Sequence, residues 1–359
     1  IVDAAADAGA DAIKLQTYTA DTMTIRVDAP GFVVDDPKSL WAGRHLYDLY
    51  QEAHTPWAWH AAIFERAASR GIHCFSTPFD DTAVDFLESL DAPAYKIASF
   101  ECTDVPLIRK VAATGKPMII STGMATVAEI DEAVRTARDA GCRDVVLLKC
   151  TSTYPSTPEN THLRTIPVMR ETFGCEVGLS DHTMGCGAAV AAVALGACVV
   201  EKHFTLARAD GGVDSAFSLE PAELKTLVVE TERAWQAMGS VRFGGLAAEA
   251  QSKTHRRSLY IVQDLQPGDV LTRKRARHTA GPGSAATRAR SDPGHARAAR
   301  RAARHGIELG LAALNGNRPR PGRDPAAIRS RFERRAGNAR APGQTRSGTR
   351  GSAGRGRRS

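Results

Sequence analysis

Seven short apolar runs, each followed by a helical pattern, repeat along residues 1–240 and constrain the fold more than any other feature. The runs, interpreted as strands, are 11–16, 72–77, 94–99, 117–122, 145–150, 175–180 and 198–204. Amphipathic stretches such as 126–141 lie between them. Strand–helix alternation predicts a parallel sheet covered by helices. Seven strands at this spacing, without a Gly-rich dinucleotide loop, predict an α/β fold, a (β/α)8 TIM barrel that lacks its first strand.

Polar side chains gather where these runs end. They are Lys14, Gln16, Ser76, Thr77, Lys96, Ser99, Ser121, Ser152, Ser180, His182 and His203. Barrel enzymes carry their chemistry at the carboxyl ends of the strands. Strand ends are also polar simply because the chain emerges into solvent there, and for any one residue that explanation is as good. A set with two lysines and two histidines indicates a catalytic face.

Two histidines end consecutive strands, His182 in the string SDH and His203 in EKHF. Neighbouring strands lie about 4.8 Å apart, so both imidazoles could reach one divalent ion. Two imidazoles completed by water or substrate oxygens suit a borderline metal such as Mn²⁺ or Zn²⁺. Taken alone, His182 would be interpreted as a loop cap and His203 as a core histidine. As a pair at consecutive strand ends they predict a metal site.

Lysines and hydroxyl groups at the strand ends predict an anion site. Lys14 and Lys96 are the leading cations, and Lys202 is a further candidate. The hydroxyl donors are Ser99, Ser121 and Ser180. A phosphate with a carboxylate needs several such groups to converge. A barrel lysine can instead form a Schiff base, so an aldolase remains an alternative, and Lys149 fits either role or a solvated one.

One carboxylate follows the third strand closely. Glu101 comes just after Lys96 and Ser99, which makes it a candidate acid, base or acceptor for a sugar hydroxyl. Asp181 and Asp214 are alternatives for the same task. Each of the three could also be an ordinary surface carboxylate.

Beyond the alternating pattern the chain changes character. Residues 241–255 form a polar linker, and 256–272 have the pattern of strand, turn and strand, which predicts the start of a small β domain. Residues 273–359 hold 23 Lys and Arg against 4 Asp and Glu, whereas the rest of the chain holds 24 basic and 36 acidic residues. This Arg-, Ala-, Gly- and Pro-rich composition predicts a disordered tail.

The cysteines show no CxxC pair and no regular spacing. They are Cys74, Cys102, Cys142, Cys150, Cys175, Cys186 and Cys198. Reduced core cysteines of a cytoplasmic enzyme fit this pattern better than a disulfide framework does. The sequence contains no apolar run of 18 or more residues, so we expect no membrane-spanning helix.

Several strings together resemble one enzyme family. KLQTYTADTMT, FSTPFD, YKIASFE, ISTGMAT, LLKCTSTYPS, GLSDHTMG, EKHFTL and GGVDSAFSLEP follow the order and spacing of the sialic acid synthase family. The resemblance covers about residues 1–272. Within the family, residues 40–60 and the string KLQTYTADTMT are most similar to pseudaminic acid synthases.

The resemblance implies a reaction and its partners. Carbon C3 of phosphoenolpyruvate joins the open-chain aldehyde of an amino sugar, water attacks C2, and phosphate leaves by C–O cleavage. For the pseudaminic acid branch the sugar is 2,4-diacetamido-2,4,6-trideoxy-altropyranose. The family also implies a divalent metal, Mn²⁺ first and Mg²⁺ or Co²⁺ as alternatives. It implies a homodimer in which an antifreeze-like (SAF) β-clip domain completes the partner's barrel, and residues 256–272 resemble the opening of that domain.

The resemblance also assigns roles to residues. The catalytic residues it implies are Lys96, Glu101, His182 and His203, the two histidines as metal ligands. For phosphoenolpyruvate they are Lys14, Thr77, Lys96, Ser99, Ser121, Ser180 and Ser152, the last standing where sialic acid synthases place an Asn. For the sugar they are Gln16, Glu101, Tyr154 and Asp214. The metal would polarise the aldehyde while the lysines hold the anionic partner.

The chain departs from the family pattern in two places. The family begins with a strand that ends in a Glu and an Asn-His-Asn-Gly loop, so we expect the first barrel strand and a candidate base to be missing. From residue 273 the string RKRARHTAG replaces a continuation like ENVRAIRPG. Codons can be chosen for the first string such that the same nucleotides, translated in a frame shifted by one nucleotide, encode the second string. We therefore expect 273–359 to be an out-of-frame translation, which resequencing of the gene tests.

Four other functions compete with this interpretation. The sugar could be the precursor of N-acetylneuraminic or legionaminic acid, and a Schiff-base aldolase would use a lysine without metal. The Arg-rich tail suggests nucleic-acid binding, but it has no aromatic residue except Phe332 and no recognisable fold, so no specific nucleic acid is expected. The two departures also make an inactive fragment an alternative.

Overall fold

Residues 1–261, 263, 266 and 276–280 are described by a computed structural model of the chain. Ile1–Gly239 form one compact unit, and the described residues from Ser240 onward belong to a second.

A single curled parallel sheet organises the first unit. Its strands are β1 (Ala12–Thr17), β2 (His73–Pro78), β3 (Tyr95–Ile97), β4 (Met118–Ser121), β5 (Val145–Cys150), β6 (Glu176–Asp181) and β7 (Val200–Lys202). They are hydrogen-bonded in sequence order, and every neighbouring pair is parallel. All seven predicted strands are present, and the predicted α/β, TIM-barrel-like class is confirmed.

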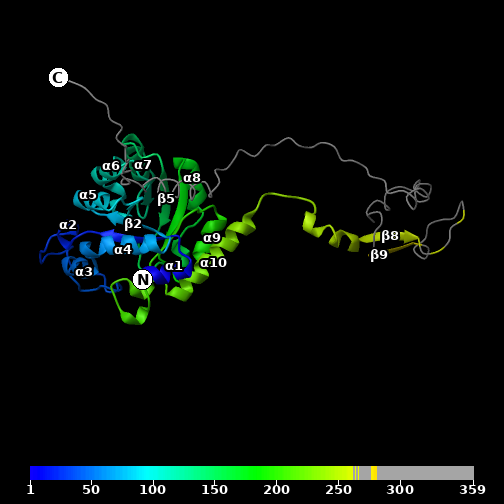
Figure 1. Ribbon diagram of the computed structural model, residues 1–359, viewed down its shortest axis with the longest axis horizontal. Helices are drawn as coiled ribbons and strands as arrows, with labels where there is room; N and C mark the ends of the chain where they lie inside the picture. Colours follow the sequence, from blue (N-terminus) through cyan, green and yellow to red (C-terminus); the bar gives the residue numbers. More distant parts are fainter. Residues whose placement is uncertain (262, 264–265, 267–275, 281–359) are drawn as a thin grey trace, which may run out of the picture. The chain divides into compact units, whose positions relative to one another are not determined.

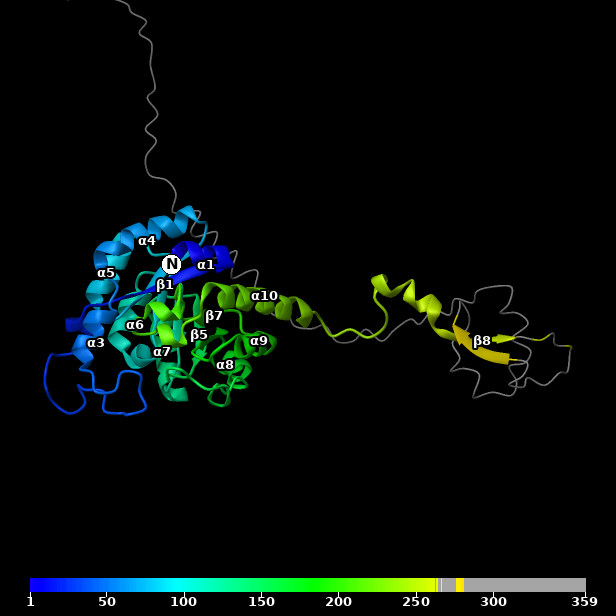
Figure 2. The same ribbon diagram turned by 90° about the horizontal axis from the view of Figure 1, so that it is seen from below.

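Helices cover the outer face of this sheet, as both views of the ribbon show (Figure 1, Figure 2). They are α1 (Val2–Ala8), α4 (Trp57–Ser69), α5 (Asp81–Ser89), α6 (Val105–Ala112), α7 (Val127–Asp139), α8 (Thr165–Phe173), α9 (Gly187–Ala194) and α10 (Pro221–Met238). Two further helices, α2 (Ala20–Met23) and α3 (Leu46–Ala53), lie in the long connection after β1. Helix α1 contacts both α4 and α10, which closes the ring of helices.

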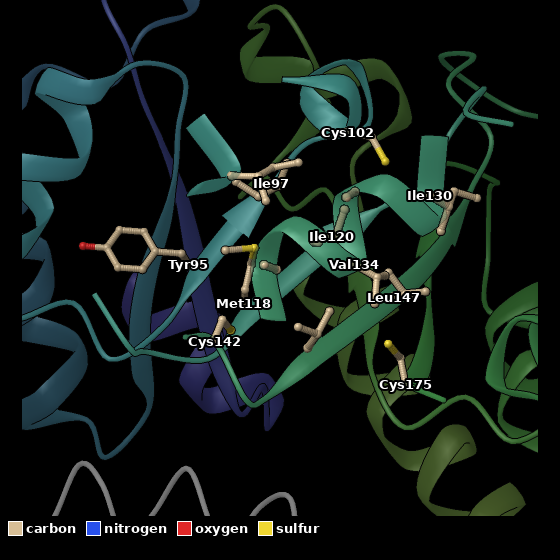
Figure 3. Packing of buried hydrophobic residues seen from close by; sticks show 14 of the residues in the cluster. Tyr95, Ile97, Cys102, Met118, Ile120, Ile130, Val134, Cys142, Leu147 and Cys175 are labelled. Carbon is tan, nitrogen blue, oxygen red and sulfur yellow. The ribbon is translucent and has the colours of Figure 1, made fainter. Parts of the chain in front are cut away.

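The main core lies between the sheet and these helices. Strand side chains such as Tyr95, Ile120 and Leu147 are fully buried there, in one cluster that also contains Ile130 and Val134 of α7 (Figure 3). Burial of each large apolar side chain contributes about 1.5–3 kcal/mol. Helix α7 begins at a reciprocal capping box of Thr126 and Glu129, which satisfies its first backbone amides.

The two edge strands of the sheet are β1 and β7. In the described part of the chain they are not hydrogen-bonded to each other, so the ring of strands stays open where an eighth strand would close a barrel. The sheet nevertheless curls far enough for side chains of β1 and β7 to meet, Lys14 with Glu201 at 3.5 Å.

The second unit contains β8 (Arg257–Ile261), which pairs antiparallel with β9 (Ala276–Ala280). Strand β8 lies where the sequence predicts the first strand of the small domain. Strand β9 is an exception to the predicted disorder of 273–359, because backbone pairing does not require apolar side chains. The other residues of that tail, and the predicted second strand of 256–272, lie outside the described residues.

Two expectations concern membranes and thiols. Of the helices that the structure describes, none is both long and apolar enough to cross a bilayer. All seven cysteines are free thiols, as the sequence predicts.

Candidate active site

A small apolar cluster shows which side chains point into the curled sheet. Ile119, Val146 and Leu148 pack there with Phe75 and Val199. These residues lie on or next to strands that face one another across the curled sheet, so the cluster fills the space that the sheet encloses. Side chains alternate along a strand, and residues two positions further on therefore face the same interior. That register directs the polar strand ends into one site.

Three strands meet at Glu201 of β7. The Ser180 hydroxyl donates to its Oε1 atom at 3.1 Å, and the Lys14 ammonium lies 3.5 Å from the same atom. Burial alone raises the pKa of Glu201. The positive charges of Lys14 and Lys96, together with smaller contributions such as the Ser180 hydrogen bond, outweigh this effect and lower that pKa to about 2. Sequence reasoning missed Glu201. Glu201 lies opposite Ser180 in the sheet register and two residues before His203, so strand alternation could have predicted that it faces the site.

Lys96 is fully buried in the middle of the short strand β3. Its ammonium donates to the Ser121 hydroxyl and to the Ile97 carbonyl, both at 2.7 Å. Burial lowers the pKa of Lys96 to about 8, Glu201 opposes this shift, and Lys14 adds to it. A buried cation with so few protein acceptors is suited to hold an anionic ligand.

Two serine hydroxyls lie together beside a glycine. Ser99 and Ser152 are hydrogen-bonded at 2.8 Å. Gly123 has φ of +44°, and a Cβ there would lie 2.5 Å from the Ser99 Cβ and 2.8 Å from the Ser152 Oγ. Only glycine therefore allows the β4–α7 turn to approach this hydroxyl pair so closely.

The two predicted metal ligands face each other. The ring centroids of His182 and His203 are 5.4 Å apart. His182 Nδ1 lies 2.8 Å from the Thr151 carbonyl, and His203 Nδ1 lies 3.4 Å from an Asp214 oxygen. Burial lowers the pKa of His182 to about 4, so this imidazole is neutral, donates from Nδ1 and keeps its Nε2 lone pair.

This arrangement fits a divalent metal ion. An imidazole whose Nδ1 is fixed by a carbonyl or carboxylate is the usual form of a histidine ligand. Within the described residues no group of three or more His, Cys, Asp or Glu side chains is arranged for a metal. His182 and His203 would therefore bind an ion whose remaining positions go to water or substrate.

Aromatic rings surround the imidazoles. The Tyr154 ring lies 4.4 Å from that of His182, and the Phe217 ring 4.9 Å from that of His203. Trp41, from the segment between α2 and α3, lies 6.0 Å from Tyr154. These rings make one side of the site apolar. Phe217 and Trp41 are not among the site residues expected from the sequence.

Among the residues that the structure describes, two buried polar atoms near the ends of β2 and β3 have no hydrogen-bond partner. Within the described residues, the Thr77 hydroxyl and Glu101 Oε2 are buried and make no hydrogen bond. Burial raises the pKa of Glu101 to about 6. Gln16 is half-buried and lies opposite Thr77 in the sheet register. Buried polar atoms that the protein leaves unsatisfied point to a ligand.

Some candidates face the other side of the sheet. Lys202 and Asp181 form a buried ion pair at 2.9 Å, and Asp181 also accepts from Thr183. Register explains this, since each lies one residue away from an inward-facing position. Lys149 donates to the carbonyl of its own strand end, Cys150.

Ser76 is likewise directed away from the site. Its hydroxyl is hydrogen-bonded to Thr17, which also contacts His60 of α4. Counting every polar residue at a strand end therefore includes too many residues, because side chains at alternate positions point away from the site.

Comparisons with known proteins show which family this chain is similar to. The model of the NeuB family matches residues 1–243. The chain is 44% identical to a pseudaminic acid synthase of Campylobacter jejuni over 271 residues, which are 76% of this chain and 78% of that protein. It is 41% identical to a pseudaminic acid synthase of Helicobacter pylori over 268 residues, 74% of this chain and 78% of that protein.

A solved structure shares the fold. The N-acetylneuraminic acid synthetase of Leptospira borgpetersenii, crystallised with citrate, is 31% identical with a TM-score of 0.61, covering 70% of this chain and 82% of that one. With its parallel curled sheet, its inward-facing lysines and its paired imidazoles, this chain belongs to the NeuB family.

Proposed function

We propose that this chain is a pseudaminic acid synthase. It would condense phosphoenolpyruvate with 2,4-diacetamido-2,4,6-trideoxy-altropyranose and water to give pseudaminic acid and phosphate. The observation that carries the proposal is the anion site of Lys14 and Lys96 beside the imidazoles of His182 and His203. The identity of 41–44% to two pseudaminic acid synthases, against 31% to the N-acetylneuraminic acid synthetase, supports this sugar.

The phosphoenolpyruvate anion would lie on the lysine side of the site. Lys14 and Lys96 would neutralise its phosphate and carboxylate, since charge-assisted hydrogen bonds are about twice as strong as neutral ones. The hydroxyl donors would be Thr77, Ser99, Ser121, Ser152 and Ser180. The short contact of Lys96 with Ser121 and the free hydroxyl of Thr77 support this assignment.

The sugar would lie on the carboxylate and aromatic side. Gln16, Glu101, Tyr154 and Asp214 would contact its hydroxyl and acetamido groups. Glu101 is suited to accept from a hydroxyl because one carboxylate oxygen is buried without a partner. Asp214 both orients His203 and remains partly exposed.

His182 and His203 would hold a divalent metal, Mn²⁺ in the first place, with Mg²⁺ or Co²⁺ as alternatives. When bound, the metal supplies Lewis-acid polarisation of the aldehyde. The protein's part is to orient both imidazoles, His182 through the Thr151 carbonyl and His203 through Asp214. Seven free thiols support a cytoplasmic location, where thiols stay reduced, and we propose a homodimer as in the family.

Phosphate release tests the function directly. The chain is incubated with phosphoenolpyruvate, Mn²⁺ and one of three sugars: the trideoxy-altropyranose, the corresponding legionaminic acid precursor, or N-acetylmannosamine. The proposal expects the highest kcat/KM with the first sugar and no release after chelation. Preference for another sugar would replace the assigned substrate, and release without metal would contradict the role of the histidine pair. His182→Ala should likewise abolish phosphate release, and His255→Ala, which changes an exposed histidine of the second unit, is its control.

A further inference from the structure

The segment between α2 and α3 is folded back on itself. Val33 and His45 form an antiparallel bridge, and Val34 exchanges backbone hydrogen bonds with Gly43 and Arg44 at 2.7 and 2.9 Å. Trp41 lies in the connecting turn, where its backbone amide donates to the Ser39 hydroxyl at 3.2 Å. The turn therefore presents Trp41 in a defined place.

Trp41 reaches across to the site from this turn. Its indole N–H donates to the Val213 carbonyl at 3.0 Å. Val213 precedes Asp214, which contacts His203. The indole ring also lies 6.0 Å from the Tyr154 ring, tilted by 51°. Trp41 thus fastens one loop to the loop that orients a predicted metal ligand.

The chemistry of this position is apolar. The single polar group of the indole is used by Val213, so its ring surface offers only aromatic contact. The neighbouring Tyr154 ring in turn contacts the His182 ring. A substrate carbonyl held near His182 and His203 would therefore bring the rest of its chain toward this aromatic surface.

We propose that Trp41 determines the sugar specificity of the site, an inference that rests on the proposed function. The trideoxy sugar carries a C6 methyl and a second acetamido group where N-acetylmannosamine carries hydroxyls. An aromatic surface favours the methyl groups and leaves a hydroxyl without a partner. In an apolar pocket, exchanging a methyl group for a hydroxyl-bearing group on the substrate changes kcat/KM by roughly 10–200-fold.

Sugar preference in Trp41 variants tests this. Trp41→Ala is expected to lower kcat/KM for the trideoxy sugar about 10- to 100-fold, to lower it less for N-acetylmannosamine, and to leave the KM for phosphoenolpyruvate within about twofold. Trp41→Phe keeps an aromatic ring but loses the bond to Val213, so it should retain the preference. The matched control is Trp59→Ala, since Trp59 on α4 is 60% exposed.

Three results would overturn the inference. They are an unchanged sugar preference in Trp41→Ala, an equal loss for both sugars and for phosphoenolpyruvate, and a loss of preference in Trp41→Phe as large as in Trp41→Ala. Circular dichroism of each variant checks that it is folded. A wild-type chain that prefers N-acetylmannosamine or turns over no sugar would instead overturn the proposed function, and this inference with it.

Discussion

The Lys14 ammonium on β1 and the Glu201 carboxylate on β7 lie 3.5 Å apart and join the two edge strands of the sheet. The same carboxylate oxygen accepts from Ser180 on β6. One carboxylate thus sets the relative position of three strands at the end of the sheet where the substrate would bind. It also offsets part of the positive charge of the anion site.

Replacing Glu201 by Gln should destabilise the first unit. The change leaves Lys14 without its counter-charge, which we expect to lower the free energy of unfolding by about 1–2 kcal/mol at pH 7. Urea unfolding measures it. The control is Glu230→Gln, which breaks an exposed pair with Arg233 and should cost less than about 0.5 kcal/mol.

The effect of Glu201 should also depend on pH. Its pKa falls from an ordinary 4.5 to about 2 in the folded chain, so its stabilisation is present above pH 4.5 and is lost as the pH falls toward 2. The difference in unfolding free energy between wild type and Glu201→Gln should therefore be smaller at pH 3 than at pH 7. An equal difference at both values would contradict this account.

Gly123→Ala should damage the anion site without removing a polar group. The new methyl would overlap Ser99 and Ser152 and separate their hydroxyls, so we expect a loss of about 1–3 kcal/mol in stability and a higher KM for phosphoenolpyruvate. Gly115→Ala is the matched control, because its φ of +68° is also positive but its Cβ position is open. Equal effects of both changes would mean that backbone strain, not the clash, is responsible.

Lys96 should make phosphoenolpyruvate binding sensitive to alkaline pH. Burial lowers the pKa of Lys96 to about 8, so the ammonium is lost as the pH rises through 8 and the KM for phosphoenolpyruvate should increase there. Lys96→Met is expected to lower kcat/KM about 100-fold and to abolish this pH dependence. Lys110→Met, which removes a surface cation paired with Asp85, should change neither. A wild-type KM that stays constant from pH 7 to 9 would reject the role of Lys96.

Glu101 should affect the sugar at acidic pH. Burial raises the pKa of Glu101 to about 6, so the carboxylate forms as the pH rises from 5 to 7, and the KM for the sugar should decrease over that range. Glu101→Gln is expected to raise this KM about 10-fold and to remove its pH dependence. The exposed Glu132 gives the control Glu132→Gln. If the variant keeps the wild-type pH profile, another group titrates.

Much of this site could be predicted from the sequence, because side chains alternate between the two faces of each strand. Once the seven strands are assigned, residues in register with Lys14, Lys96 and Ser180 must face the interior. The same rule, applied residue by residue, would have removed Lys202 and Asp181, whose pairing at 2.9 Å is on the opposite face. The strands were recognisable because buried parallel strands are continuous apolar runs.

Other features depend on contacts that no local pattern records. Glu201 meets Lys14 only because the two edges of the sheet curl toward each other. Trp41 reaches Val213 through a long connection whose path is set by tertiary packing. Both contacts join segments far apart in the chain, and sequence periodicity describes only neighbours.

The fate of labelled oxygen tests the central claim, that this site condenses phosphoenolpyruvate with an amino sugar. Phosphoenolpyruvate labelled with ¹⁸O at its bridging C2 oxygen is incubated with the trideoxy-altropyranose and Mn²⁺, and the products are analysed by mass spectrometry. The account predicts phosphate that retains the label, together with a nine-carbon acid. Unlabelled phosphate, or a lysine adduct trapped by borohydride without release of phosphate, would contradict it.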